Sequence, residues 1–215
     1  MLIRRVSLLG CLGIMCVGWG CAPAKLQIDG VAIDQVANPA SGQAVVLVKV
    51  KDARPFSADT SDITVPSMDR PQEISDSAIK ARTVGRFFRA WNNTDLTDVV
   101  LPEGQSVETL VSDAVGNALR SKGYRVEPSG SAGIGVEVEI TKFWMFSRLQ
   151  AFGPSECNST VEIVLKSPVT ESGSAETITG SYSIHPSGAL GIGVATIDDS
   201  LEDLSKNIQA KIKSP

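Results

Sequence analysis

The sequence predicts an α+β domain in which an antiparallel sheet of about four to five strands carries two amphipathic helices packed on one face. Two observations predict this fold class. Apolar residues recur at helical spacing in two stretches, 106–122 and 198–212. Three other stretches alternate apolar and polar residues, which is typical of antiparallel strands that expose one face to water. We expect a single domain over residues 44–215.

The first part of this domain contains strands and a long excursion. Ala44–Val50 is a nearly continuous β-branched run, which predicts a central strand. Residues 52–82 are polar and contain prolines, so we expect a loop with one short helix near 73–80. Residues 83–91 predict a second strand, and residues 98–101 a short extended piece.

The clearest helix covers residues 106–122. Ser106 is suited to cap its first turn, and Gly123 is suited to end it. One face of this helix is apolar and consists of Val107, Leu110, Val111, Ala114, Val115, Ala118 and Leu119. This stripe predicts a helix that packs on the sheet.

The last part of the chain predicts three strands and a closing helix. Residues 134–141, 160–165 and 177–184 alternate between apolar and polar side chains. The closing helix is expected over 198–212, with Asp198 and Asp199 at its start. Its apolar edge consists of Leu201, Leu204, Ile208 and Ile212.

The N-terminus predicts a lipoprotein signal peptide over residues 1–20. Arg4 and Arg5 precede the apolar run 6–19, which is too short to cross a bilayer because a spanning helix needs about 20 residues. Gly20 and Cys21 resemble the lipobox of bacterial lipoproteins, so we expect a lipid on Cys21. Leu8–Cys11 also fits the box by letter but would leave too short an apolar run. Residues 21–43 are then a lipidated N-terminus and a spacer docked loosely on the domain.

Charge and cysteine content exclude several classes of function. The net charge is −4 with no basic cluster, so the electrostatic footprint of nucleic-acid binding is missing. Three of the four cysteines lie within residues 1–21, which leaves Cys157 without a partner for an intramolecular disulfide. His185 is the only histidine, and neither a metal site nor a cofactor is expected. We interpret His185 as a surface residue and Cys157 as a thiol without a catalytic role.

Several motifs resemble the YajG family of Gram-negative envelope lipoproteins. They are Cys21 near the start, Asp52-Ala53-Arg54-Pro55 after a strand, and Lys122-Gly123-Tyr124-Arg125-Val126 after the helix. The resemblance implies a non-enzymatic protein anchored to the outer membrane and facing the periplasm. Ala22 after the lipidated cysteine agrees with outer-membrane sorting. Domains of this class also resemble the auxiliary lipoproteins of ABC-type lipid-transport systems, which is the alternative function.

Two further groups of residues are candidates for a site. Asp52 and Arg54 lie on one side of a continuing strand, where they form a structural charge pair or recognise a partner. In the run 143–146, alternation from Val138 and Ile140 puts Trp144 and Phe146 in the core. Phe143 and Met145 then become a candidate partner surface, unless the excursion 52–82 covers that face.

The sequence as a whole predicts a membrane-anchored, non-enzymatic envelope lipoprotein that acts as a binding or accessory module. Its partners would be the membrane, through the lipid anchor, and an envelope protein, a lipid or a cell-wall component. An envelope hydrolase that uses dispersed carboxylates is the remaining alternative.

Overall fold

The structure is a computed structural model that describes residues 25–59, 61–89, 96–149, 155–185 and 192–215. Its elements are β1 (Leu26–Gln27), β2 (Ala44–Asp52), the 3-10 helix η1 (Pro71–Ser75), α1 (Ser77–Arg82), β3 (Thr83–Arg89), β4 (Leu96–Val100), α2 (Val107–Ser121), β5 (Arg125–Glu127), β6 (Ile134–Leu149), β7 (Glu156–Lys166), β8 (Ala175–Ile184) and α3 (Ile192–Lys211). No helix in these ranges is both long and apolar enough to cross a membrane.

The predicted sheet is wrong in its size and in the direction of its strands. The described residues form one mixed sheet of eight strands, in which β1–β4, β2–β5, β2–β6 and β3–β6 pair in parallel. The pairs β3–β4, β6–β7 and β7–β8 are antiparallel. Alternation in the sequence shows that a strand has one wet face, but it does not show which strand lies beside it or in which direction that strand runs.

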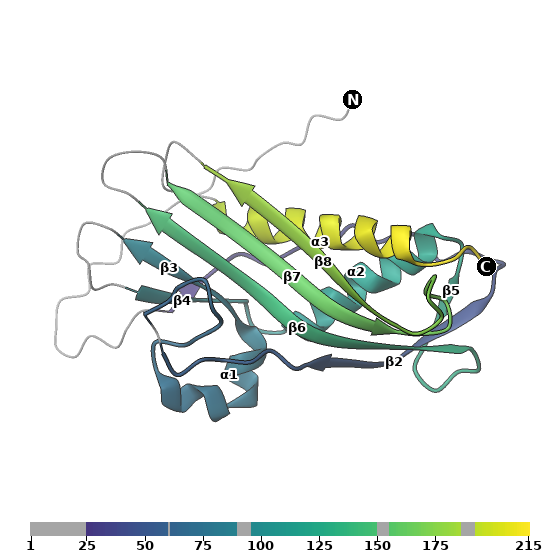
Figure 1. Cartoon of the computed structure of the whole chain (residues 1–215), viewed down its shortest axis with the longest axis horizontal. Coiled ribbons are helices and arrows are strands. Elements are labelled where there is room, and N and C mark those ends of the chain that lie inside the picture. The colour runs from purple at the N-terminus through teal and green to yellow at the C-terminus, as the bar shows by residue number, and fades with distance from the viewer. Residues whose placement is uncertain (1–24, 60, 90–95, 150–154, 186–191) are drawn as a thin grey trace.

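Strand β6 organises the sheet (Figure 1). It is 16 residues long, and β7 pairs along one of its edges. Two strands share its other edge: β2 pairs with residues 134–140, and β3 pairs with residues 145–149. A fork therefore opens between β2 and β3, opposite the middle of β6.

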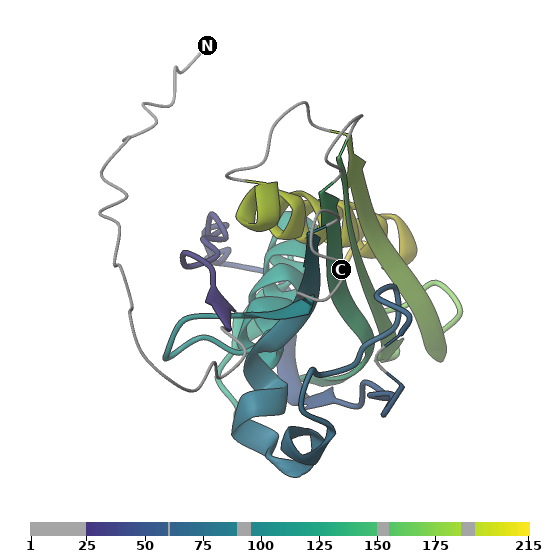
Figure 2. The same cartoon turned by 90° about the vertical axis from the view of Figure 1, so that its left-hand side faces the viewer.

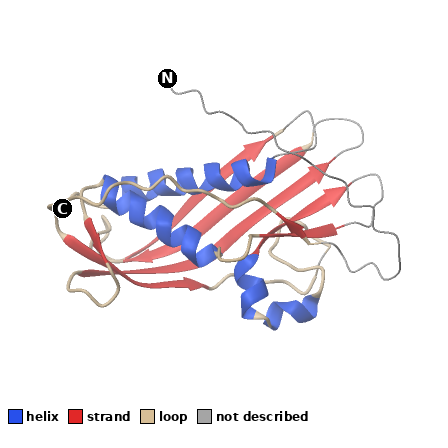
Figure 3. Cartoon of the chain, turned by 180° about the vertical axis from the view of Figure 1, so that it is seen from behind, coloured by secondary structure: helices blue, strands red, loops and turns tan. Residues whose placement is uncertain are grey.

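Helices α2 and α3 lie together on one face of the sheet (Figures 2 and 3). Helix α2 packs against β2 and β5, α3 packs against β7 and β8, and the two helices contact each other. The predicted cap of α2 is confirmed, since the Ser106 side chain accepts a hydrogen bond from the Thr109 backbone N–H. Helix α3 begins at Ile192, earlier than expected, so Asp198 and Asp199 lie inside it.

A glycine lets α3 approach the edge strand β8. A Cβ atom added to Gly180 would lie 2.3 Å from the Ser200 carbonyl oxygen on α3, so only glycine fits there. Two side chains of α3 also bind the outer edge of β8. Asp203 accepts a hydrogen bond from the Ser181 N–H at 3.0 Å, and Asn207 donates one to the Thr179 carbonyl at 2.8 Å. These contacts fix α3 on the sheet and cover part of an open strand edge.

Candidate functional site

Residues 25–38, which we call the N-terminal strap, are held along the domain. The strap begins as β1, which pairs with β4, and the Ile28 N–H donates to the Val100 carbonyl at 3.1 Å. At the same end, Lys25 Nζ lies 2.6 Å from Glu73 Oε2. From there the strap runs across the helical side of the domain (Figure 3).

Three carboxamide side chains fix the strap, and each uses both its donor and its acceptor. Gln105 accepts from the Val31 N–H (3.1 Å) and donates to the Val31 carbonyl (2.9 Å). Asn117 accepts from the Val36 N–H (3.0 Å) and donates to the Asp34 carbonyl (2.9 Å). Asn38 makes the same pair of bonds with the Val126 backbone. The expected loose docking of the spacer is therefore wrong for residues 25–38.

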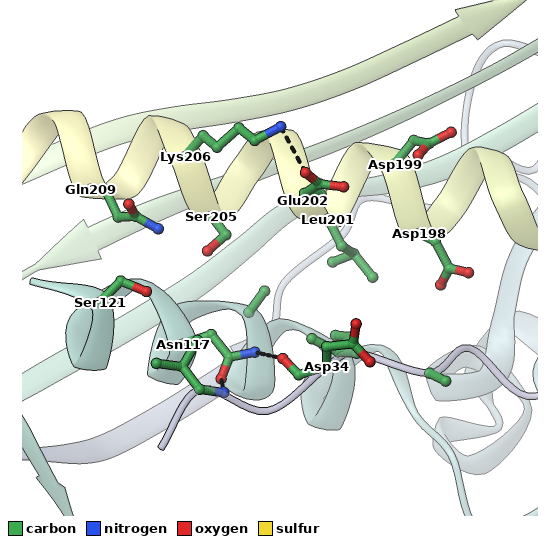
Figure 4. Close-up of a pocket in the computed structure, with 14 residues that line it drawn as sticks. Asp34, Asn117, Ser121, Asp198, Asp199, Leu201, Glu202, Ser205, Lys206 and Gln209 are labelled. Atoms are coloured by element: carbon green, nitrogen blue, oxygen red, sulfur yellow. Dashed lines mark hydrogen bonds and ion pairs between the residues drawn. The ribbon is translucent and has the colours of Figure 1, made fainter. Parts of the chain in front are cut away.

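The strap forms one wall of a groove between α2 and α3 (Figure 4). The groove has a volume of about 520 Å³, within the range of roughly 300–1,000 Å³ typical of ligand pockets. Its lining residues are Ala32, Ile33, Asp34 and Val36 from the strap, Ala114, Asn117 and Ser121 from α2, and Asp198, Asp199, Leu201, Glu202, Ser205, Lys206 and Gln209 from α3.

The charge of this groove is predominantly negative. Four carboxylates line it, at Asp34, Asp198, Asp199 and Glu202. The single lining cation, Lys206, lies 2.7 Å from Glu202, and the hydrogen bond and charge of Glu202 raise the pKa of Lys206. Apolar residues of the strap, Ala32, Ile33 and Val36, line the same groove, so the lining suits a long side chain with an aliphatic stem and a positive head.

Arg54 occupies the fork between β2 and β3. It is 1% exposed, and its guanidinium forms two hydrogen bonds with the Asp52 carboxylate, at 2.9 and 2.8 Å. The same group donates to three backbone carbonyls, those of Thr83 (2.7 Å), Phe143 (3.0 Å) and Lys80 (2.7 Å). These contacts join β2, α1, β3 and β6, as expected of the structural interpretation of this pair.

The predicted partner surface is wrong because Phe143 and Met145 are buried in the core, at 0% and 2% exposure. The register of β6 against β7 shifts between Ile140 and Lys142, which leaves Thr141 as an extra residue. Such a bulge exchanges the two faces of a strand beyond it. Apolar side chains after the bulge therefore face the helices at odd positions, whereas those before it do so at even positions.

The opposite face of this strand is covered by the excursion, which was the other interpretation of the aromatic run. Trp144 is 1% exposed, and its indole N–H donates to the Ile63 carbonyl at 2.8 Å. The ring of Phe56 meets the Trp144 ring edge-on at 6.0 Å between centroids. Both faces of this part of β6 are therefore filled by the chain itself.

The remaining sequence candidates do not assemble a catalytic pair among the described residues. Cys157 is buried, its Sγ lies 3.3 Å from Thr196 Oγ1, and burial raises the pKa of its thiol. His185 is exposed at the end of β8. In the part of the chain that the structure describes, no group of His, Cys, Asp and Glu side chains is arranged to hold a metal. The expected lipidation site, Cys21, lies outside the described residues.

Sequence reasoning missed the residues that fix the strap and line the groove. Asn117 offered one signal, because an asparagine in the middle of a helix is unfavourable unless its amide has a partner. Gln105 offered none, since a polar residue in the connection before a helix is ordinary. Of the α3 carboxylates, the sequence pattern places Asp198 and Asp199 at a helix start and indicates no role for Glu202. Their approach to Asp34 depends on the path of the strap.

Comparisons with known proteins find structures of similar fold whose sequence identity to this chain is low. No family model and no curated protein matches this sequence. The structure is similar to a crystal structure described as an uncharacterized protein, with 12% identity, 87% of this chain and 98% of that chain covered, and a TM-score of 0.44. It is also similar to the crystal structure of protein XCC0632 from Xanthomonas campestris, of family DUF330. The identity is 10%, the match covers 85% of this chain and 91% of that chain, and the TM-score is 0.41.

Proposed function

We propose that this protein is a membrane-anchored, non-enzymatic binding module of the bacterial envelope. A lipid on Cys21 anchors it, and its domain faces the periplasm on the outer membrane, as the lipobox and the resemblance to the YajG family imply. The observation that carries the proposal is the strap. It starts four residues after Cys21 and forms one wall of the groove, so the anchored segment is itself part of the site.

The groove supports binding of a positively charged partner. Lys and Arg side chains have apolar stems that would pack on Ala32 and Val36 of the strap and heads that would meet the carboxylates. The partner that fits this chemistry is a basic segment of an envelope protein. We propose binding and not hydrolysis because a lining of carboxylates and apolar residues suits the recognition of a cationic side chain.

The anchor is tested first. Replacing Cys21 by serine removes the sulfur that would carry the thioether-linked lipid, so the variant is expected in the soluble fraction or as an unprocessed precursor. Mass analysis of the wild-type N-terminus is expected to find acylated Cys21. Acylation of Cys11 or Cys16 instead would contradict the proposed anchor.

The groove is tested with a labelled peptide of alternating lysine and leucine. The double variant Asp34→Asn, Glu202→Gln removes two of the four lining carboxylates, and we expect about three- to tenfold weaker binding, since exposed charge pairs contribute about 0.2–1 kcal/mol each. Fluorescence anisotropy on the full mature protein measures this change.

The matched control is the variant Glu103→Gln, Glu137→Gln, which removes the same charge at exposed positions outside the groove. It is expected to leave the affinity unchanged. An equal loss in both variants would show attraction to the overall negative charge only, and equal binding of a glutamate–leucine peptide would contradict a site for cations.

A further inference from the structure

We infer that the domain is held in one orientation on the membrane, with the β1–β4 end against the lipid headgroups and the β5 end away from them. This inference rests on the proposed lipid at Cys21. Two observations indicate which end of the domain faces the membrane. They are the place where the strap becomes fixed to the domain and the small number of residues between that place and Cys21.

The distance from the anchor to the domain is short. Three residues separate Cys21 from Lys25, and the four residue-to-residue steps span at most about 14 Å in any conformation. At Leu26 and Gln27 the strap belongs to the sheet, since Leu26 pairs with Val99 and Gln27 with Val100. A strap that was free up to β2 at Ala44 would span several times that distance, and the domain would then turn freely.

The strap also gives the domain a direction relative to the anchor. Its contacts follow α2 from one end to the other: Gln105 before the helix, Asn117 in its third turn, and Val126 after it. Helix α2 has 15 residues and is therefore about 22 Å long. The β5 end of the molecule therefore lies farther from the anchor than the β1–β4 end by about that length.

The side chains at the β1–β4 end suit a membrane interface. Leu26 is 43% exposed, which makes it one of four large apolar side chains with such exposure among the described residues. Next to it, the Lys25 side chain is 35% exposed, and Lys25 and Arg70 both pair with Glu73. An apolar side chain beside ion-paired polar groups fits the boundary between acyl chains and headgroups.

Energy transfer tests this orientation on the full mature lipoprotein. The protein is incorporated into vesicles of phosphatidylethanolamine and phosphatidylglycerol that contain a rhodamine-labelled headgroup lipid. A donor dye is attached at Asp29→Cys in the strap or at Ser131→Cys near β5, both of which are exposed positions. We expect transfer from position 29 to exceed that from position 131 by about twofold or more, because about 20 Å of helix separates the two ends.

The control lengthens the tether without changing the domain. A flexible Gly-Ser insertion of about 20 residues between Ala24 and Lys25 adds a mean reach of about 25 Å, so the difference between the two positions is expected to disappear. Equal transfer from both positions in the protein without the insertion, with Cys21 acylated, overturns the orientation and leaves the anchor intact. Absence of the acyl group, read by mass analysis before reconstitution, overturns the proposed anchor and the orientation together.

Discussion

The double substitution Phe143→Ser, Met145→Ser is expected to unfold the domain or bring it close to unfolding. Both side chains are buried in the core beneath the helices. Truncating a buried Phe costs about 3–5 kcal/mol and a buried Met about 2–5 kcal/mol. The combined loss approaches the whole stability of a typical domain, about 5–15 kcal/mol. Denaturant unfolding followed by circular dichroism measures the effect.

An exposed position on another strand of the same sheet provides the control. Val48→Ser removes apolar atoms from a residue that is 56% exposed, and we expect a change within about 0.5 kcal/mol. If the double variant keeps the wild-type midpoint, the bulge at Thr141 is absent and Phe143 and Met145 face solvent. The experiment therefore distinguishes the observed core face from the face that alternation alone predicts.

Replacing Arg54 by methionine is expected to destabilise the domain by about 3–5 kcal/mol, as when one partner of a buried ion pair is removed. The substitution leaves the Asp52 carboxylate without its counter-charge and three carbonyls, those of Thr83, Phe143 and Lys80, without their donor. Arg54→Lys keeps the positive charge but has fewer hydrogen-bond donors, so we expect a loss of unfolding free energy between zero and that of Arg54→Met. Thermal or denaturant unfolding at neutral pH measures both variants.

Arg148→Met is the matched control, because Arg148 is an exposed arginine on β6. It is expected to change the free energy of unfolding by no more than about 0.5 kcal/mol. A similarly small effect of Arg54→Met would show that the fork between β2 and β3 is held together without the guanidinium.

Acid should reduce the difference between wild type and Arg54→Met. Burial raises the pKa of Asp52, but the hydrogen bonds and the charge of Arg54 outweigh burial and hold the pKa below its ordinary value. A carboxyl whose pKa is lowered by folding stabilises the folded state above the unfolded-state pKa of about 3.9, and this contribution is lost as pH falls through the folded-state pKa. Unfolding of both proteins from pH 7 to pH 3 is expected to show the two stabilities converging below about pH 4.

Patterns within a single element were predictable from the sequence. The apolar stripe of residues 106–122 identified α2 and its cap at Ser106 because both depend on neighbouring residues. The alternation of residues 160–165 and 177–184 identified β7 and β8 for the same reason. The spacing of Asp52 and Arg54 placed a charge pair at the end of β2, where the ion pair forms at 2.8 Å.

The tertiary structure alone decided how these elements combine. The bulge at Thr141 arises from the pairing of β6 with β7, and one extra residue was enough to exchange the faces of Phe143 and Trp144. The parallel pairing of β2 and β3 on one edge of β6 created the fork that Arg54 fills. The groove exists because Asn117 holds the strap beside α3. Local patterns show which face of an element avoids water, whereas the choice of neighbour depends on residues that are distant in sequence and meet only when the chain is folded.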